Sequence, residues 1–452
     1  MQIVLVGCGN VGADIAKSLS REGHNITVVD VNERLVKDLS DELDLMGYAG
    51  NGATIEVLED AGVKSADLMI AATDSDERNL LCCFIAKKSG TAYTIARVRN
   101  PEYKKEIEFI KEDLGLSLVV NPELAAAEEI ARLLKFPQAI EIDTFAKGRV
   151  ELLKFEVTKE SPLCGMQLKY MSKKLDCNVL VCTVERDNVT MIPNGDFTMW
   201  EGDKISFIAS GKKAAQFFKA AKMNTGRVRS AMIVGGGMIC VYLANILLTS
   251  GVEVKIIEKD KRICEALAER LPDAIIINGD GADKTLMEEE GILNAEAFVS
   301  LTNHDEENVM MSVYVKKVNP KAKLITKVHR NVYDDIISDL NIGSIINPKL
   351  LAAENVVKYV RAMSNTMDSN IETLYSLNAG NAEALEFTVK ESSSLINVPL
   401  QDLNLKKNVM IACIIHKGQI EAPGGQSTIQ MGDTVIVVTT ERGFVDINDI
   451  LA

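Results

Sequence analysis

The sequence lacks the clustered cysteines and histidines that hold a structural zinc ion. Its nine cysteines form no Cys-x-x-Cys pair, and its four histidines (His24, His304, His329 and His416) lie far apart. Because zinc sites need such ligands at short, repeated spacings, we predict no metal site. The cysteine count is odd and the sequence opens without a signal peptide, so we expect reduced thiols in a cytosol.

The chain also lacks an excess of positive charge. Its 64 acidic residues outnumber 50 lysines and arginines, which leaves a formal net charge of −14. Since this charge repels phosphate, we expect no nucleic-acid partner. A redox-sensing transcription factor would in addition need a basic recognition helix, and the sequence contains none. A net negative charge of this size is more typical of a large assembly, which the repulsion between its copies keeps soluble.

One uncharged run, residues 230–252, has the ~20 residues that could span a bilayer as a helix. It contains three consecutive glycines at 235–237, and it aligns with residues 3–23, whose helical part carries Asp14 and Lys17. We therefore interpret the run as a strand, a glycine loop and a helix, and predict no transmembrane span.

The strongest positive signal lies in the first thirty residues. Gln2 to Val6 is a short apolar run that predicts a buried strand, and Gly7-Cys8-Gly9-Asn10-Val11-Gly12 follows it. Apolar residues at helical spacing come next, and a second strand then ends on Asp30. In a βαβ unit this acid reaches the hydroxyl pair of a ribose.

Each glycine of this loop has its own task. Gly7 makes the tight turn, Gly9 lets backbone N–H groups approach a pyrophosphate, and Gly12 lets the helix pack on the strand. The positive end of the helix dipole faces the same anion. The pattern therefore predicts a nucleotide site rather than a plain turn between a strand and a helix.

The chain repeats itself at a shift close to half its length. Gly7 and Gly9 match Gly235 and Gly237, and Asp30 matches Glu258. The further matches are Asn51-Gly52 with Asp280-Gly281, Thr73-Asp74 with Thr302-Asn303, Arg97 with Lys327, and Asn121-Pro122 with Asn347-Pro348. Solenoid repeats are far shorter, so we interpret this as a tandem duplication of domains.

Alternating strands and helices predict the fold of each large repeat. In the first copy, apolar runs at residues 2–6, 25–30, 67–71, 92–98 and 117–120, with a weaker one at 46–49, alternate with helical patterns. This order is typical of a doubly wound parallel sheet, an α/β Rossmann-like fold. Loops after its strands should meet at one crevice, which brings together Gly7 to Val11, Asp30, Asn51, Gly52, Thr73, Asp74 and Arg97. Arg97 would there bind a phosphate or pair with a neighbouring acid.

A small α+β domain follows each large one. Glu123 to Lys135 predicts a crossover helix, and strands are expected at Val150 to Val157, Cys177 to Val184 and Lys204 to Ala209. The same apolar positions recur near residues 387–400. We therefore predict domains at 1–123, 140–222, 228–349 and 370–452, with the joint between the halves at Met223 to Arg229.

The second glycine loop departs from the first. Gly235-Gly236-Gly237 is followed by Met238-Ile239-Cys240, so that Cys240 replaces the third glycine, and Glu258 is one methylene longer than Asp30. We expect this crevice to fit its ligand less well. It binds an adenine nucleotide or is retained only as scaffold.

These motifs resemble a known family. The segments GCGNVG with Asp30, NGAT, ATDSDERN and PNGDFTMWEGD are similar to those of the TrkA family, the peripheral nucleotide-binding subunits of Trk-type potassium uptake systems, built from RCK or KTN domains. The resemblance covers essentially the whole chain. It implies a cytoplasmic regulator at the inner face of the membrane that binds NAD(H) or ATP/ADP and is not an enzyme. It further implies a homotetrameric gating ring that controls a membrane potassium channel or transporter.

The resemblance also implies nucleotide contacts, carried over by matching motif positions. In the first copy these are Gly7, Cys8, Gly9, Asn10, Val11, Asp30, Thr73, Asp74 and Arg97. In the second copy they are Gly235, Gly236, Gly237, Met238, Ile239, Glu258, Asn303 and Lys327. We add Asn51, Gly52 and Asp280 from the loop after the third strand; Asn51 stands where the family often has Asp.

An NAD-dependent dehydrogenase is the alternative, because the opening motif fits it equally well. Such an enzyme needs a substrate domain that supplies a general acid or base beside the hydride acceptor. Residues 140–222 contain no histidine and show no cluster of residues that could serve as a general acid and base. The sequence therefore favours the regulator.

Overall fold

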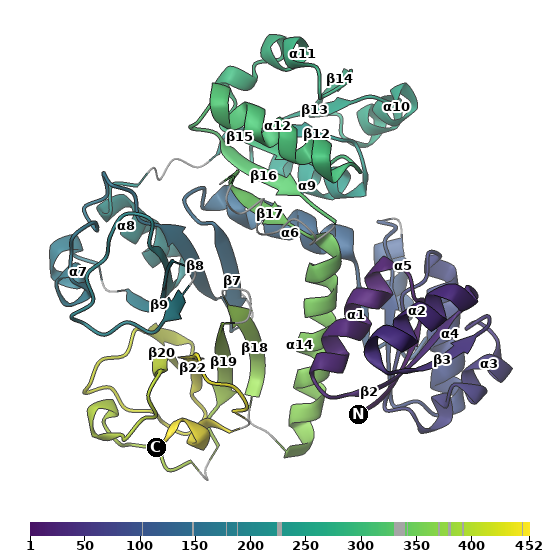
Figure 1. Ribbon diagram of the computed structural model, residues 1–452, viewed down its shortest axis with the longest axis horizontal. Helices are drawn as coiled ribbons and strands as arrows, with labels where there is room; N and C mark the ends of the chain where they lie inside the picture. Colours follow the sequence, from purple (N-terminus) through teal and green to yellow (C-terminus); the bar gives the residue numbers. More distant parts are fainter. Residues whose placement is uncertain are drawn as a thin grey trace. The chain divides into compact units, whose positions relative to one another are not determined.

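The structure, a computed structural model, divides into two compact units (Figure 1). It describes residues 1–452 except positions 102, 147–148, 178, 188, 224–227, 330–339, 341, 369–370, 378–380, 391–392 and 445. Unit 1 joins Met1–Ile130 with Ala231–Val360, and unit 2 joins Ala131–Ser230 with Arg361–Ala452. Most of the joint expected at Met223 to Arg229 lies outside the described residues. So does residue 370, the expected first residue of the last domain.

The first large domain is a six-stranded parallel sheet in the order β3-β2-β1-β4-β5-β6. Its strands are β1 (Gln2–Val6), β2 (Asn25–Asp30), β3 (Met46–Ala49), β4 (Leu68–Ala71), β5 (Tyr93–Arg97) and β6 (Leu118–Val120). Its helices are α1 (Asn10–Arg21), α2 (Glu33–Leu43), α3 (Ile55–Asp60), α4 (Asp76–Ser89) and α5 (Tyr103–Ile110). The predicted doubly wound, Rossmann-like fold is confirmed.

The second large domain repeats this arrangement, with strand order β14-β13-β12-β15-β16-β17. Its strands are β12 (Ser230–Val234), β13 (Glu253–Glu258), β14 (Ile275–Asn278), β15 (Ala297–Ser300), β16 (Lys323–Lys327) and β17 (Ser344–Ile346). Its helices include α9 (Met238–Thr249), α10 (Lys261–Arg270), α11 (Lys284–Glu289) and α12 (Asp305–Val318). The uncharged run therefore forms β12 and α9. Among the described residues, no helix is long and apolar enough to cross a membrane.

Successive residues of each parallel strand enter opposite faces of the sheet. Ile3 and Leu5 belong to the core on one face, which α1 and α2 cover. Val4 and Val6 belong to the core on the other face, where α3 and α4 pack. Since both faces of the central strands are buried, β1 and β4 are almost entirely apolar rather than alternating, and the sequence therefore shows them clearly.

Each large domain continues into a long helix that begins at a proline. These helices are α6 (Pro122–Lys135) and α14 (Pro348–Asp368). The side chain of Asn121 accepts a hydrogen bond from Leu124 N at 2.8 Å, and that of Asn347 accepts one from Lys349 N at 3.1 Å. Asparagine before proline thus caps both helices.

Helix α14 comes from the second copy but completes the core of the first domain. Its Ala353, Val356 and Val360 are fully buried in one cluster with Ile15 and Leu19 of α1. Figure 1 shows α14 lying alongside α1. A second tie is Tyr242 of α9, whose hydroxyl donates to Arg99 O at 2.8 Å. The two copies therefore build unit 1 jointly.

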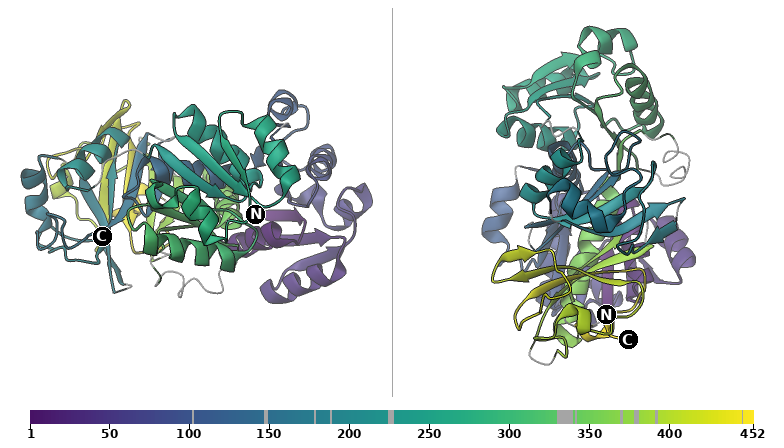
Figure 2. Two further views of the ribbon diagram at one scale, coloured as in Figure 1. Left: turned by 90° about the horizontal axis from the view of Figure 1, so that it is seen from above. Right: turned by 90° about the vertical axis from the view of Figure 1, so that its left-hand side faces the viewer.

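Unit 2 contains two five-stranded antiparallel sheets, whose strands Figure 2 shows in blue to teal and in green to yellow. The first, in the order β10-β9-β11-β8-β7, consists of β7 (Glu141–Phe145), β8 (Val150–Glu156), β9 (Leu180–Arg186), β10 (Val189–Met191) and β11 (Lys204–Ala209). Helices α7 (Leu168–Leu175) and α8 (Gly211–Ala220) accompany it. The second, in the order β18-β19-β22-β20-β21, consists of β18 (Ile371–Leu377), β19 (Ala382–Thr388), β20 (Val409–His416), β21 (Gln419–Glu421) and β22 (Thr434–Thr439).

The two small domains share a hydrophobic core. Leu152 and Ile208 of the first sheet are clustered with Ala384, Ile415 and Val438 of the second. The strand predicted at Cys177 to Val184 begins only at Leu180. Asp176 adopts a left-handed conformation (φ 47°) at the end of α7, so the chain is still turning before the strand starts.

Candidate nucleotide-binding cavity

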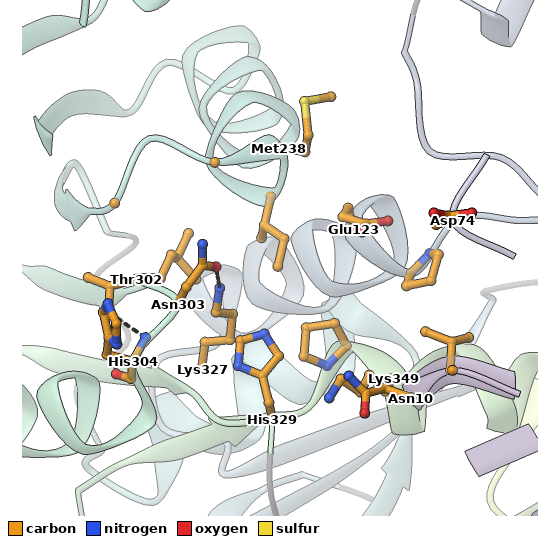
Figure 3. Close-up of a pocket in the computed structure, with 18 of the residues that line it drawn as sticks. Asn10, Asp74, Glu123, Met238, Thr302, Asn303, His304, Lys327, His329 and Lys349 are labelled. Carbon is orange, nitrogen blue, oxygen red and sulfur yellow. Dashed lines mark hydrogen bonds between the residues drawn. The ribbon is translucent and has the colours of Figure 1, made fainter. Parts of the chain in front are cut away.

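Both glycine loops open on one cavity in unit 1, with a volume of about 960 Å³ (Figure 3). The predicted site residues that line it in the first copy are Gly7, Gly9, Asn10, Val11, Asp30, Asn51, Gly52, Thr73, Asp74 and Arg97. Those in the second copy are Gly235, Gly236, Gly237, Met238, Ile239, Glu258, Asp280, Asn303 and Lys327. Cys8 is not among the lining residues, because its side chain is buried in the core. The two crevices expected from the duplication are thus parts of one space.

The first glycine loop is tightly packed on two sides and open on the third. A Cβ at Gly7, where φ is +104°, would lie 2.7 Å from the backbone carbonyl carbon of Ala72. A Cβ at Gly12 would lie 1.8 Å from Gly7 O. A Cβ at Gly9 would meet nothing within 4 Å, so this residue borders open space. The loop therefore has the backbone cradle that a pyrophosphate needs at the N-terminus of α1.

The glycines of the second loop have nearly the same backbone angles as those of the first, despite Cys240. Gly235 has the same φ of +104°, and Gly237 precedes α9 with φ −69° and ψ −176°, against −67° and −177° at Gly9. The first turn of the helix is slightly wider, with Val241 N to Gly237 O at 3.2 Å against Ala13 N to Gly9 O at 2.8 Å. Burial, reinforced by the charge of Glu258, raises the pKa of Cys240 to about 12, so its thiol stays neutral.

The acid at the end of the second strand is held by its glycine loop in both copies. Asp30 Oδ2 accepts from Cys8 N at 2.7 Å, and Glu258 Oε2 accepts from Gly236 N at 2.6 Å. Gly236 leaves room for Glu258 and for the helix beside it, since a Cβ there would lie 2.7 Å from Leu267 Cδ1 and 3.0 Å from Glu258 Oε2. Both carboxylates line the cavity and can accept further hydrogen bonds from ribose hydroxyls.

Asn51 and Gly52 act mainly on the shape of the crevice. The side chain of Asn51 accepts from Ala53 N at 3.0 Å and so shapes its own loop. A Cβ at Gly52 would lie 2.3 Å from Val6 Cγ1, and one at Gly281 would lie 2.2 Å from Val234 Cγ1. These glycines therefore allow their loops to pack on the first strand of each sheet.

A buried asparagine, not predicted from the sequence, positions the next loop in each copy. Asn79 Oδ1 accepts from Thr73 N at 2.8 Å, and its Nδ2 donates to Arg97 O at 2.9 Å. Asn308 makes the same bonds to Thr302 N and Lys327 O, both at 3.0 Å. The signal was present in the sequence, because both asparagines close the matched segments TDSDERN and TNHDEEN.

Arg97 faces the cavity and also pairs with an acid. Its Nη2 lies 3.5 Å from Glu123 Oε1, at side-chain exposures of 15% and 21%. Burial lowers the pKa of Arg97, and the charge of Glu123 opposes this effect. Arg97 Nε is buried without a hydrogen-bond partner among the described residues. Both roles expected for Arg97, binding a phosphate and pairing with a neighbouring acid, therefore have a physical basis. The acid is Glu123, which was not predicted from the sequence.

Substitution of Gly9 and Gly237 by leucine, one at a time, is expected to block one half of the cavity without unfolding the domain. Each added side chain would enter open space where a pyrophosphate should lie. Because Gly12 and Cys240 differ, we expect the first site to be the tighter or the more selective. Calorimetry with NADH, ATP and ADP measures this. The same loss and the same ligand profile from both variants would contradict the asymmetry.

Comparison with known proteins gives the family. The chain matches the TrkA-N domain over residues 3–122 and 231–348, and the TrkA-C domain over residues 152–222 and 384–451. The chain belongs to the TrkA family. The family resemblance of the sequence motifs is thereby confirmed, over most of the chain and in the same doubled order.

Similar relatives include two potassium uptake proteins. The TrkA-family chain is 31% identical to "Trk system potassium uptake protein TrkA homolog 1" of Methanosarcina mazei, with 97% of each chain covered. It is 30% identical to "Trk system potassium uptake protein TrkA" of Halomonas elongata, with 98% of this chain and 96% of the other covered. Both relatives align over nearly their full length.

Solved structures share the fold at low sequence identity. The GsuK RCK domain has a TM-score of 0.63 at 14% identity, with 97% of this chain and 92% of that chain covered. A GsuK channel bound to NAD also has a TM-score of 0.63 at 14% identity, with 97% and 77% covered. The TrkA-family chain therefore has the RCK fold.

Proposed function

We propose that this chain is the nucleotide-binding regulatory subunit of a Trk-type potassium uptake system, without catalytic activity of its own. The observation that carries the proposal is the cavity of unit 1, onto which two glycine loops open, each with a carboxylate at the end of its second strand. The names of the relatives support a role in potassium uptake. A GsuK channel, to which this chain is similar in fold, is bound to NAD.

The ligands that fit are NAD(H) and ATP or ADP. We infer that Asp30 and Glu258 accept hydrogen bonds from ribose hydroxyls, and that the N-termini of α1 and α9 bind the phosphates. The open space beside Gly9 and Gly237 supports this placement. Arg97 and Lys327 are the cations that we expect to bind a phosphate, since both line the cavity and are largely buried.

The proposed partner is a membrane-embedded potassium channel or transporter of the Trk type, which the chain meets at the cytoplasmic face of the membrane.

RCK rings use eight domains, so a chain with two would complete a ring as a homotetramer. Light scattering at micromolar concentration with nucleotide present is expected to give four copies, and a strict monomer would count against the ring. Two assays separate the regulator from a dehydrogenase. A regulator is expected to copurify with the membrane subunit, whereas a dehydrogenase is expected to oxidise NADH when it is given its substrate.

Asp30→Ala is expected to weaken nucleotide binding at the first site by ~1–3 kcal/mol, because a charged hydrogen bond to the ribose is lost. NADP(H) should bind clearly worse than NAD(H), since a 2′-phosphate would meet this carboxylate, and Val31, Asn32 and Glu33 supply no arginine. Calorimetry with NADH and NADPH tests both expectations in the Gly237→Leu background. Equal affinity for the two dinucleotides would overturn the ribose assignment.

A further inference from the structure

A tyrosine side chain of the second copy binds the segment of the first copy that follows β5. Tyr242 lies on α9, and its hydroxyl donates a hydrogen bond to Arg99 O at 2.8 Å. The same hydroxyl accepts a hydrogen bond from Asn121 Nδ2 at 3.0 Å, and Asn121 Nδ2 also donates to Arg99 O at 3.2 Å. Burial raises the pKa of Tyr242, so the hydroxyl keeps the proton that it donates. The three groups therefore form a closed triangle of hydrogen bonds between the two copies.

On the side of the first copy, this triangle is joined to the loops that line the first site. Arg99 lies two residues after Arg97, which lines the cavity. The Arg99 guanidinium donates to Asp74 O, and Arg99 N donates to Asp76 Oδ2 at 2.9 Å. Asp76 is only 6% exposed, so this contact is held in the interior. Since Asp74 also lines the cavity, a nucleotide at the first site would contact the same segment that Tyr242 holds.

On the side of the second copy, Tyr242 lies about one helical turn beyond the second glycine loop. Met238 and Ile239, in the first turn of α9, line the cavity, whereas Tyr242 is not among the lining residues. The N-terminus of α9 is where we place the phosphates of the second nucleotide. Because hydrogen bonds fix successive turns of an α-helix to one another, a shift of this N-terminus also moves Tyr242.

Other contacts hold the two copies together without this hydroxyl. Val356 of α14 is fully buried in one cluster with Ile15 and Leu19 of α1. Removal of the Tyr242 hydroxyl is therefore expected to leave unit 1 folded. In the structure, where the hydroxyl makes its hydrogen bonds, a Cβ at Gly9 or Gly237 would meet nothing within 4 Å. The arrangement that Tyr242 stabilises thus has both glycine loops open to a ligand.

We propose that the two nucleotide sites bind cooperatively and that the Tyr242 hydroxyl couples them. The inference rests on the proposed function, since it takes each glycine loop to bind a nucleotide. A nucleotide at one site fixes the position of either α9 or the segment around Arg99. The hydrogen bonds of Tyr242 then favour the open arrangement of the other site, so the second nucleotide binds more tightly than it would alone. Tyr242 is a positioning residue, because it acts on both sites through α9 and Arg99.

Calorimetry with ADP measures the coupling. Gly9→Leu and Gly237→Leu proteins each retain one site and give the two single-site affinities. The unchanged protein is expected to bind its second ADP at least about fivefold more tightly than these affinities predict. Tyr242→Phe keeps the ring and removes both hydrogen bonds of the hydroxyl. It should reduce this coupling factor by about threefold or more, and leave the affinity of each single-site variant unchanged.

Tyr314→Phe is the matched control. The Tyr314 hydroxyl donates to Glu288 Oε1 at 2.5 Å within the second copy, and Tyr314 is not a lining residue of the cavity. Its loss should leave the coupling factor unchanged. Independent binding of two ADP molecules by the unchanged protein overturns the inference without any variant at Tyr242.

The variants give two further outcomes that contradict the coupling. An unchanged coupling factor in Tyr242→Phe protein, or an equal fall in Tyr314→Phe protein, overturns the role of the Tyr242 hydroxyl and leaves the proposed function standing. If neither single-site variant nor the unchanged protein binds a nucleotide, the proposed function fails together with the inference.

Discussion

Lys327→Met protein is expected to unfold at a temperature several degrees higher than the unchanged protein, and to lose nucleotide binding at its second site. Burial lowers the pKa of Lys327 from 10.5 to about 8. The charged form is therefore disfavoured in the folded state by about 3 kcal/mol at neutral pH. A methionine of similar length removes this cost but cannot bind a phosphate.

The pH dependence of this effect has a definite sign. Below about pH 8 the lysine is charged in both the folded and unfolded states, so the full cost is present. Between pH 8 and 10.5 the unfolded state binds more protons, so the free energy of unfolding rises with pH. The stabilisation by Lys327→Met should accordingly shrink over this range. Thermal unfolding at pH 7 and pH 10 measures the difference.

Lys323 supplies a matched control. Burial also lowers its pKa to about 8, and its Nζ donates to Ser344 Oγ at 3.1 Å, but it is not a lining residue of the cavity. Lys323→Met should stabilise the protein in the same way and leave nucleotide binding intact. If Lys327→Met destabilises the protein, the buried charge of Lys327 is not destabilising. If the variant leaves binding at the second site unchanged, Lys327 does not bind a phosphate.

Gly12→Ala is expected to destabilise the first large domain by several kcal/mol and to abolish nucleotide binding at the first site. The new Cβ would lie 1.8 Å from Gly7 O, and a backbone carbonyl cannot move aside as a side chain can. Either α1 shifts away from β1 or the loop changes shape, and both outcomes destroy the pyrophosphate cradle. Chemical denaturation and calorimetry measure the two effects.

The corresponding change in the second copy should be mild. Cys240 already has a Cβ at the matched position, and the first turn of α9 is wider there. Cys240→Ala removes only a buried sulfur, for a cost of about 1 kcal/mol, and should leave binding at the second site intact. Equal damage from Gly12→Ala and Cys240→Ala would mean that the two loops are not packed in these different ways.

The sequence predicts the large domains well because their parallel strands are buried on both faces. β1 and β2 have the predicted bounds, and Gly7 and Asp30 mark where each strand ends. The small antiparallel domains give weaker patterns. Strand β7 (Glu141–Phe145) and helix α8 (Gly211–Ala220) were not predicted, and β9 begins later than its apolar residues suggest.

The charged residues Glu123 and Lys349 of the cavity could not be predicted, because their place in it depends on contacts between the copies. Helix α14 begins with an apolar pattern after Pro348, but nothing in that pattern says that it packs on α1 of the other copy. Glu123 and Lys349 lie outside every glycine-loop motif. Only the folded unit 1 brings them to one cavity with Arg97 and Lys327.

The central claim is that nucleotides bound in this cavity change how the chain acts on a potassium channel or transporter. A ligand can do so only if it binds two states of the assembly with different affinity, and coupling of ~1–3 kcal/mol corresponds to a shift of about 5- to 150-fold. The extra phosphate of ATP and the redox state of the nicotinamide are the two plausible sources of this difference.

Potassium flux into liposomes tests this claim most directly. The liposomes contain the matching Trk-type membrane subunit, this protein is added, and ATP, ADP, NADH or NAD is supplied in turn. The account predicts that flux depends on which nucleotide is present, and that this dependence is reduced with Asp30→Ala protein. Flux that is the same with all four nucleotides, and the same again with Asp30→Ala, would contradict the account even if the nucleotides bind.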